Sequence, residues 1–438
     1  MILRIPFRRL ALASLLSLWL PGASPAAWAE EDGLAAALRH TVTSHPALAG
    51  KRAQLESRAL EADAVRRQWY PTLSAQAQQY ADANRSSVTG EDLSTPMSVR
   101  LSQPLWTFGR IGSQAELADA ERRLERWDLL RVQRELLEEV AVAYASVVGL
   151  RERLRVARQG AEEHRVLHEQ IRRRQEGGRA SRADVRLART RLAQAESGVT
   201  RLEGERDVAL NELRSLTRAP LAAREAVPTA LLEAIPPSSR LTDWVLAASA
   251  ELRVGRQEVA RADARVTRQR KAQMPTLSLQ AEQFHDQPAH QDDRRISLVF
   301  EGSLEGLGLA NRDRTRAALS EREAAVQGQL DTRDEVAREA RRLVRNRRLQ
   351  ADLIEAKRRS VADSRAVLAS YQRQYAAGSK SWLDVMNMLR EVNGQRLELA
   401  QARSDWLLES LRLLARAGGL DGLAGIALPG DGNAGGGE

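Results

Sequence analysis

The chain contains one long pattern twice, and this duplication limits its fold more than any other feature. The segment Arg66–Ala77, which includes Pro-Thr-Leu-Ser-Ala-Gln-Ala, returns 204 residues later as Arg270–Ala281. A second segment, Gly178–Val185, returns as Gly378–Val385 after 200 residues and keeps its glycine, serine, aspartate and valine. Two matches in the same order and at nearly one spacing indicate a tandem duplication in which each copy forms one structural unit.

Each copy has the same order of expected elements. A helix runs up to the repeated proline (47–68 and 250–273), and two segments of alternating polarity follow, separated by a polar loop. A long helical stretch, a glycine turn and a second long helix complete the copy. The stretch Arg110–Glu176 has no proline, and about 65 helical residues would extend roughly 100 Å. Apolar residues at spacings of three and four predict coiled-coil packing along these helices.

The four alternating segments predict strands with one apolar and one polar face. They cover residues 72–78, 97–105, 276–282 and 296–304, and about ten residues suffice for a tilted strand to cross a membrane. The loops expected between them, Asp82–Pro96 and His285–Arg295, are long and charged, which is typical of extracellular barrel loops. The polar face would line a channel lumen through seven residues: Thr72, Ser74, Gln76, Arg100, Ser278, Gln280 and Glu282.

Four aromatic residues stand at one end of the first strand pair. Trp69 and Tyr70 precede the first strand and Trp106 and Phe108 follow the second, which predicts an aromatic girdle at a membrane interface. An antiparallel sheet packed on a soluble core would give the same alternation. In lipid, four strands with unpaired edges leave backbone groups unsatisfied. The barrel interpretation therefore requires several chains, and three chains would form a closed barrel of about twelve strands.

The N-terminal residues have the pattern of a secretory signal. Arg4, Arg8 and Arg9 form a basic start, Leu10–Leu20 is apolar, and Ala27-Trp28-Ala29 is a small-x-small cleavage site. The chain has no cysteine, so it has no disulfide and no cysteine to carry lipid. The expected organisation is a signal (1–29), a first repeat (30–218), a linker (219–240), a second repeat (241–417) and a disordered Gly-rich tail (418–438).

The glycine turns between the long helices share one capping pattern. Gly178 and Gly378 can end a helix with a positive φ. Ser181 and Ser381 can then cap the next helix, with Asp184 and Asp384 as their capping-box partners. A plain capped hairpin explains each residue singly, whereas the same pattern in both copies indicates a shared tip surface.

In this order of features the chain resembles the TolC-like outer-membrane efflux protein family. The resemblance rests on both Pro-Thr-Leu strand starts, on the strand-to-helix junction Gln103–Arg110 and on the helical tip Gly178–Val185, within residues 34–418. It implies a homotrimer with a twelve-stranded barrel in the outer-membrane lipid, continued by a helical tunnel across the periplasm. It also implies docking of a periplasmic adaptor and an inner-membrane pump through the tips, at Gly178, Ser181, Asp184, Gly378, Ser381 and Asp384. The second junction, Gly302–Leu309, lacks the proline of the first, which leaves its local geometry open.

The sequence contains few candidates for metal-binding or catalytic sites. His164 and His168 are four residues apart, a spacing that can bind a metal, but the glutamate of the metalloprotease pattern is missing. Histidines and aspartates gather in the loop 285–293, where solvated side chains are the usual outcome. We find no phosphate loop, nucleophile elbow or dinucleotide fingerprint, and so expect no enzyme and no cofactor. The net charge of +9 is spread along the helices and does not predict a nucleic-acid partner.

The sequence thus predicts a mainly α chain with a small β part, which combines a long coiled-coil helical barrel with a trimer-shared transmembrane β-barrel of four strands per chain. The first hypothesis is an exit duct for a tripartite exporter in type I protein secretion, since drug-efflux relatives often carry a lipidated cysteine. The second is a drug or metal efflux channel with the same architecture. The third, from another class, is a soluble periplasmic coiled-coil scaffold.

Overall fold

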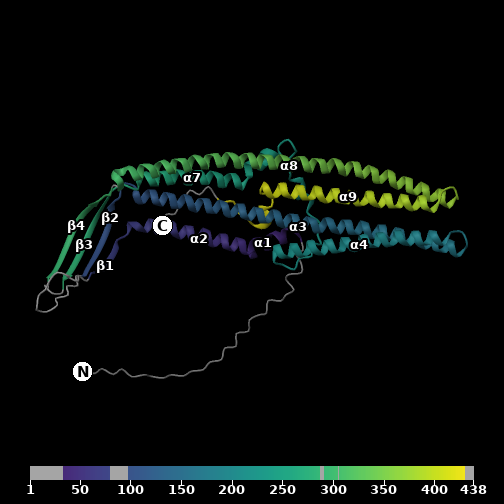
Figure 1. The fold of residues 1–438 in the computed structure, drawn as a ribbon, viewed down its shortest axis with the longest axis horizontal. Coiled ribbons are helices and arrows are strands. Elements are labelled where there is room, and N and C mark those ends of the chain that lie inside the picture. The colour runs from purple at the N-terminus through teal and green to yellow at the C-terminus, as the bar shows by residue number, and fades with distance from the viewer. Residues whose placement is uncertain (1–32, 79–96, 287–290, 304, 430–438) are drawn as a thin grey trace, which may run out of the picture.

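The computed structural model describes residues 33–78, 97–286, 291–303 and 305–429 (Figure 1). The predicted signal and the first predicted loop lie outside these residues. The helices are α1 (Leu34–Ser44), α2 (Pro46–Arg66), α3 (Arg110–Glu176), α4 (Arg182–Thr217), α5 (Thr229–Glu233), α6 (Leu241–Ala248), α7 (Ala250–Lys271), α8 (Leu309–Ala376), α9 (Trp382–Arg416) and α10 (Asp421–Ala424). The strands are β1 (Thr72–Ala77), β2 (Met97–Trp106), β3 (Thr276–Asp286) and β4 (Gln291–Glu301). Short 3₁₀ helices, η2 (Arg67–Trp69) and η3 (Glu305–Gly308), stand where helix and strand meet.

The helices form an elongated layer that carries the sheet at one end and two helical hairpins at the other. Figure 1 shows α8 along one long side and α2 and α4 along the other, with α3, α7 and α9 between them. Near the sheet, α3 packs against α2 and α7; toward the hairpins, it packs against α4 and α9. The predicted helix Arg110–Glu176 has the same bounds as α3. In the described part of the chain, no helix is both long and apolar enough to cross a membrane.

The four strands form one antiparallel sheet in the order β1-β2-β3-β4. The two repeats meet at its centre, where β2 of the first pairs with β3 of the second. The register sets Leu73 opposite Leu101, Leu101 opposite Ala281, and Ala281 opposite Ile296. Residues directly opposite each other point to one face, so the apolar sides of all four strands coincide, as the alternation predicts.

A bulge in β2 corrects one detail of that alternation. Pro104 pairs with Ser278 and Trp106 pairs with Leu277, which leaves Leu105 as the extra residue. Trp106 therefore takes the position opposite Leu277 that simple alternation would give to Leu105. A bulge of this kind shifts the parity of the strand by one residue, and alternation alone does not reveal it.

The loop predicted at His285–Arg295 is wrong at both ends. β3 continues through Asp286 and β4 begins at Gln291, with Arg294 paired to Gln283 and Arg295 paired to Glu282. Charged residues interrupt the alternation here, but pairing with a neighbouring strand supplies the backbone hydrogen bonds that extend the ladder. The first expected loop, Asp82–Pro96, lies outside the described residues.

Both strand-to-helix junctions turn in the same way, although their sequences differ. Phe108 (φ 50°) and Gly109 (φ 84°) precede α3, and Leu307 (φ 56°) and Gly308 (φ 89°) precede α8. Consecutive residues with positive φ redirect the chain into the helix, two at the first junction and three at the second, where Gly306 (φ 55°) precedes the pair. Such a φ strains residues other than glycine, so Phe108 and Leu307 depend on the surrounding structure to hold it. The second junction thus enters its helix through a similar turn without the proline of the first.

The main core lies near the middle of the long helices, where the segment after α4 and the C-terminal segment fold back onto them. In the predicted linker, Leu221, Ala223 and Val227 are buried in this core. The tail expected to be disordered from Gly418 is ordered through residue 429. Its helix α10 places Asp421 beside the buried Arg134, with a shortest contact of 2.7 Å. Residues 430–438 lie outside the described part.

A close approach of α3 and α9 joins the repeats within the helical layer. A Cβ atom added at Gly149 would lie 2.7 Å from Ser404 Cβ and 3.7 Å from Ser404 Cα. Glycine at this position therefore lets the two helices pack at short range, and any larger residue must push them apart.

We predict that Gly149→Ala lowers the stability of the protein by about 1–3 kcal/mol, the range for overpacked helix contacts. Gly112→Ala in the same helix is the control, because its Cβ would meet no atom within 4 Å. There alanine should stabilise the helix by up to about 1 kcal/mol. The measurement is the thermal midpoint of the helical circular-dichroism signal; equal midpoints for the two variants would contradict the close contact.

Candidate functional site: the sheet surface and the helical tips

The seven residues predicted to line a lumen all lie on one face of the sheet. Thr72, Ser102 and Gln280 form one row across the strands, and Ser74, Arg100 and Glu282 form the next. Arg295 extends the second row into β4. An ion pair joins Arg100 to Glu282 at 2.8 Å, so the charges in this row are matched across β2 and β3. The sequence did not single out Arg295, whose place in this row depends on strand pairing.

The opposite face is apolar and exposed. Leu73 is 69% exposed, Ile296 is 78% exposed and Leu298 is 66% exposed. A soluble protein rarely leaves such a contiguous apolar surface uncovered. No helix of the described chain packs on the sheet faces; the helices lie beyond one end of the strands (Figure 1). This arrangement differs from a sheet packed on a soluble core.

The predicted aromatic girdle gathers at the end of the sheet nearest the helices. The Trp106 and Phe108 rings meet edge to face at 6.0 Å, and Phe108 meets Phe300 in the same way at 6.3 Å. The Trp69 carbonyl accepts a hydrogen bond from Gln103 Nε2 at 2.7 Å. Tyr70 is 66% exposed. The structure adds Phe300 of β4 to this group, which the sequence did not place beside Phe108.

The two helical tips are built alike, as the repeated motif predicts. After α3, Gly178 has φ +73° and the Arg179 N–H donates to the Arg174 carbonyl at 2.8 Å. After α8, Gly378 has φ +81° and the Ser379 N–H donates to the Gln374 carbonyl at 2.9 Å. Both geometries end a helix in the Schellman manner, for which glycine is favoured because it has no Cβ.

Capping boxes begin the returning helices. The Asp184 N–H donates to Ser181 Oγ at 3.1 Å, and the Ser181 N–H donates to Asp184 Oδ2 at 2.9 Å. Ser381 and Asp384 repeat both bonds at 3.2 and 3.1 Å. The hydrogen bond from the Ser181 backbone lowers the pKa of Asp184, and the hydrogen bond from the Ser381 side chain lowers the pKa of Asp384. Both carboxylates are therefore ionised at neutral pH.

The tips also contact each other, through residues that the repeat motif did not indicate. The Arg174 guanidinium lies 4.1 Å from the centre of the Tyr375 ring. Besides Ser181, Trp382 of the second tip also helps to lower the pKa of Asp184 in the first. Below these contacts an apolar cluster holds the hairpins together, with Ile171 of α3 and Met386 of α9 fully buried. The tips form one surface rather than two separate ends.

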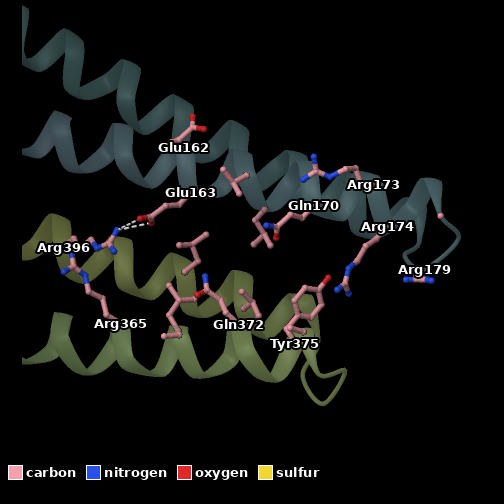
Figure 2. A pocket seen from close by; sticks show the side chains of 18 residues that line it. Glu162, Glu163, Gln170, Arg173, Arg174, Arg179, Arg365, Gln372, Tyr375 and Arg396 are labelled. Atoms are coloured by element: carbon pink, nitrogen blue, oxygen red, sulfur yellow. Dashed lines mark hydrogen bonds and ion pairs between the residues drawn. The ribbon is translucent and has the colours of Figure 1, made fainter.

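A groove runs along this joined end (Figure 2). It has a volume of ≈ 1000 Å³, with walls from α3 and α8 and a floor from α9. In Figure 2, Arg174 and Tyr375 point toward each other across it near the tips. Farther from the tips, Arg396 Nη1 reaches Glu163 at 2.8 Å. Arginines and glutamates thus line a groove whose floor is apolar at Val385 and Leu389.

The histidine pair lacks the surroundings of a metal site. His164 is buried in α3, and burial lowers its pKa. His168 has Glu169 as a neighbour at 3.8 Å. Among the described residues, no group of three or more histidine, cysteine, aspartate or glutamate side chains is arranged to hold a metal ion. The side chains of His285, Asp286, His290 and Asp292 in the predicted loop cluster lie outside the described part.

Comparison with known proteins agrees with this geometry. The sequence profile of the outer membrane efflux protein family matches residues 38–217 and 241–419, which are the two repeats. The chain belongs to this family. It is 26% identical over 344 residues to the alkaline protease secretion protein AprF of Pseudomonas aeruginosa, covering 74% of this chain and 69% of AprF. It is 24% identical over 257 residues to the proteases secretion protein PrtF of Dickeya chrysanthemi, covering 56% and 55%.

Solved structures show the same fold. CusC, a protein that forms a transmembrane channel, superposes with a TM-score of 0.77 at 16% identity, covering 94% of this chain and 98% of CusC. The chain is thus an outer-membrane efflux family protein with the channel-tunnel fold, in which the long helices form the periplasmic part. Proteins of this kind are channels rather than enzymes. Family membership favours the channel over the soluble periplasmic scaffold.

We predict that Asp184→Asn loosens the start of α4 without unfolding the protein. Hydrogen exchange of the first-turn amides should accelerate roughly threefold to tenfold, the range for a lost helix cap. Asp384→Asn should do the same at α9 and leave α4 unchanged, so each variant is the control for the other. Equal exchange in wild type and Asp184→Asn would show that the carboxylate does not hold the cap.

The pH dependence of this cap follows from the lowered pKa of Asp184. A carboxyl group whose pKa is lowered in the folded state stabilises that state at pH values above its ordinary pKa of 3.8. This stabilisation is lost as the pH falls through the lower pKa of the folded state. First-turn protection in wild type should therefore persist at pH 5 and disappear only below about pH 3.8. Loss of protection already at pH 5, measured by hydrogen exchange, would contradict the assigned bonds.

Proposed function

We propose that the chain is one subunit of a homotrimeric exit duct, which serves type I protein secretion as the outer-membrane part of a tripartite exporter. The observation that carries this proposal is the combination of an exposed apolar sheet face with a polar face that holds all seven predicted lumen residues. A surface of this kind fits a strand set with lipid on one side and water on the other.

The sheet edges support assembly from several copies. β1 and β4 are the outer strands and each pairs on only one side within the described chain. In lipid, an unpaired edge leaves N–H and C=O groups unsatisfied at a cost of several kcal/mol each. Pairing β4 of one copy with β1 of the next removes every edge, and three copies would give a barrel of about twelve strands.

Protein cargo is favoured by the relatives that resemble the sequence. AprF is described as a secretion protein for an alkaline protease, and PrtF as a secretion protein for proteases. The alternative is a drug or metal efflux channel with the same architecture. The family description, which refers to efflux, favours that alternative, and a fold shared at 16% identity does not separate the two.

The helical tips are the proposed docking surface for a periplasmic adaptor, which would connect the duct to an inner-membrane pump. Both tips expose an ionised carboxylate, Asp184 or Asp384, beside a glycine turn. The groove next to them offers arginines for acidic partner groups. The pump would provide the energy for export, because the sequence contains no nucleotide-binding motif.

The experiment that tests the cargo assignment is affinity purification of the tagged protein from its native membrane after mild crosslinking. Recovery of an adaptor with an ATP-driven exporter would support type I secretion. Recovery of an adaptor with a proton-driven pump would support small-molecule efflux instead. Asp184→Lys combined with Asp384→Lys should reduce adaptor recovery at least about fivefold, a loss of roughly 1 kcal/mol; unchanged recovery would contradict docking at the tips.

Single cysteines can test the two faces of the sheet, because the natural chain contains none. Gln280→Cys lies on the proposed lumen face and Leu279→Cys, its neighbour, on the apolar face. A charged, membrane-impermeant thiol reagent should reduce the bilayer conductance of Gln280→Cys channels by tens of per cent. The attached groups narrow the pore and change the charge of its lining. Leu279→Cys should not respond. The reverse response would assign the faces the other way.

A further inference from the structure

A cavity separate from the groove lies on the helical layer, where α4 and α9 flank α3. It has a volume of ≈ 290 Å³, close to the smaller end of the range for small-molecule sites. Each of the three helices contributes one glycine to its lining: Gly160 of α3, Gly198 of α4 and Gly394 of α9. A Cβ added at Gly198 or Gly394 would meet no atom within 4 Å. The absence of side chains at these positions is therefore what leaves the space open.

Two polar side chains, one from α3 and one from α9, line this space. His164 of α3 is only 7% exposed, and burial lowers its pKa. The Asn393 Nδ2 atom is buried and unsatisfied, although Asn393 Oδ1 accepts a hydrogen bond from Arg396. An unmet buried donor costs free energy, so a protein rarely keeps one without a use for it.

The charges around the cavity are all of one sign. Arg191, Arg201 and Arg390 line it, and none of its lining residues is acidic. Arg201 is neutralised by Glu205 one turn along α4. In the described structure Arg191 bonds only to the uncharged Gln194, and no carboxylate lies within ion-pair distance of Arg390. Two cations thus face the space without a balancing anion.

The remaining lining is apolar. Val156 and Ala157 of α3, Leu202 of α4 and Leu397 of α9 surround one part of the space. A ligand that fits must combine a negative group, placed among the arginines, with a compact apolar body. An inorganic anion would leave the apolar part empty, and an uncharged apolar molecule would leave the cations and the Asn393 amide without partners.

We propose that this cavity binds a small organic carboxylate with a compact apolar body. The carboxylate accepts hydrogen bonds from Asn393 Nδ2 and from Arg191 or Arg390, and the body lies against Leu202 and Leu397. Charge-assisted hydrogen bonds of this kind are stronger than neutral ones. Since α4 belongs to the first hairpin and α9 to the second, the ligand spans both and holds them together.

Benzoate is the probe for the test, with benzyl alcohol as its uncharged counterpart of nearly the same shape. Isothermal titration on the full-length protein in amphipol should show that benzoate binds at least tenfold more tightly than benzyl alcohol. Gly198→Leu should bind benzoate at least tenfold more weakly than wild type, because leucine fills the open space. Gly204→Leu, on the exposed face of the same helix, also meets no atom within 4 Å and should bind benzoate like wild type.

Arg390→Gln tests the charge, because it removes one cation from the lining and leaves a polar side chain in its place. This variant should bind benzoate several-fold more weakly than wild type and bind benzyl alcohol with unchanged affinity. Circular dichroism would confirm that each variant is folded. The proposal is overturned if wild type does not bind benzoate, if Gly198→Leu binds it as tightly as wild type, or if the acid and the alcohol bind equally.

Discussion

The structure depends on the packing of α3 against helices from both repeats. Together with strand pairing in the sheet, this contact joins two similar units into one body. Gly149 lets α3 approach α9 closely at Ser404, and farther toward the tips Gly160 lies against Asn393 in the same pair of helices. At the other end, β2 pairs with β3. The repeats are therefore fixed to each other both in the sheet and along the helices, so the positions of the sheet and of the tips are linked through one long element.

The duplication also explains why the tips can contact each other without being identical. Both copies retain the glycine, serine and aspartate that shape the turn, because backbone geometry requires them. The surrounding positions have diverged. Tyr375 and Trp382 of the second tip correspond to Gln175 and Arg182 of the first. The Tyr375 ring of the second tip thus meets Arg174 of the first, a contact that two identical tips could not make.

Sequence reasoning was most successful where the local pattern and the final structure require the same residues. The bounds of α3 and the two capped tips were predicted from a proline-free stretch and a turn motif, and both signals act within a few residues. The failures arose from pairing between distant segments. The bulge at Leu105 and the strand residues Asp292–Arg295 depend on neighbouring strands, and the ordered tail depends on the contact between Asp421 and Arg134. None of these partners is close in sequence.

For the same reason, the sequence did not predict two other features. These are the contacts of one tip with the other and the cavity between α3, α4 and α9. Arg174, Tyr375 and Trp382 have no motif of their own, and His164 was considered only as a metal ligand. Its burial between three helices, beside the Asn393 amide, follows from the way α4 and α9 flank α3. The shared sheet face of the seven predicted lumen residues, in contrast, followed from alternation alone, because period-two patterning specifies a strand's faces directly.

If several copies of this chain close their sheet edges into one barrel in a lipid bilayer, the assembly should survive release from the lipid. Native mass spectrometry of the protein released from lipid nanodiscs measures this. We expect a single dominant species with the mass of three chains, stable at low protein concentration. A dominant monomer in lipid, with the edges of β1 and β4 unpaired, would contradict it.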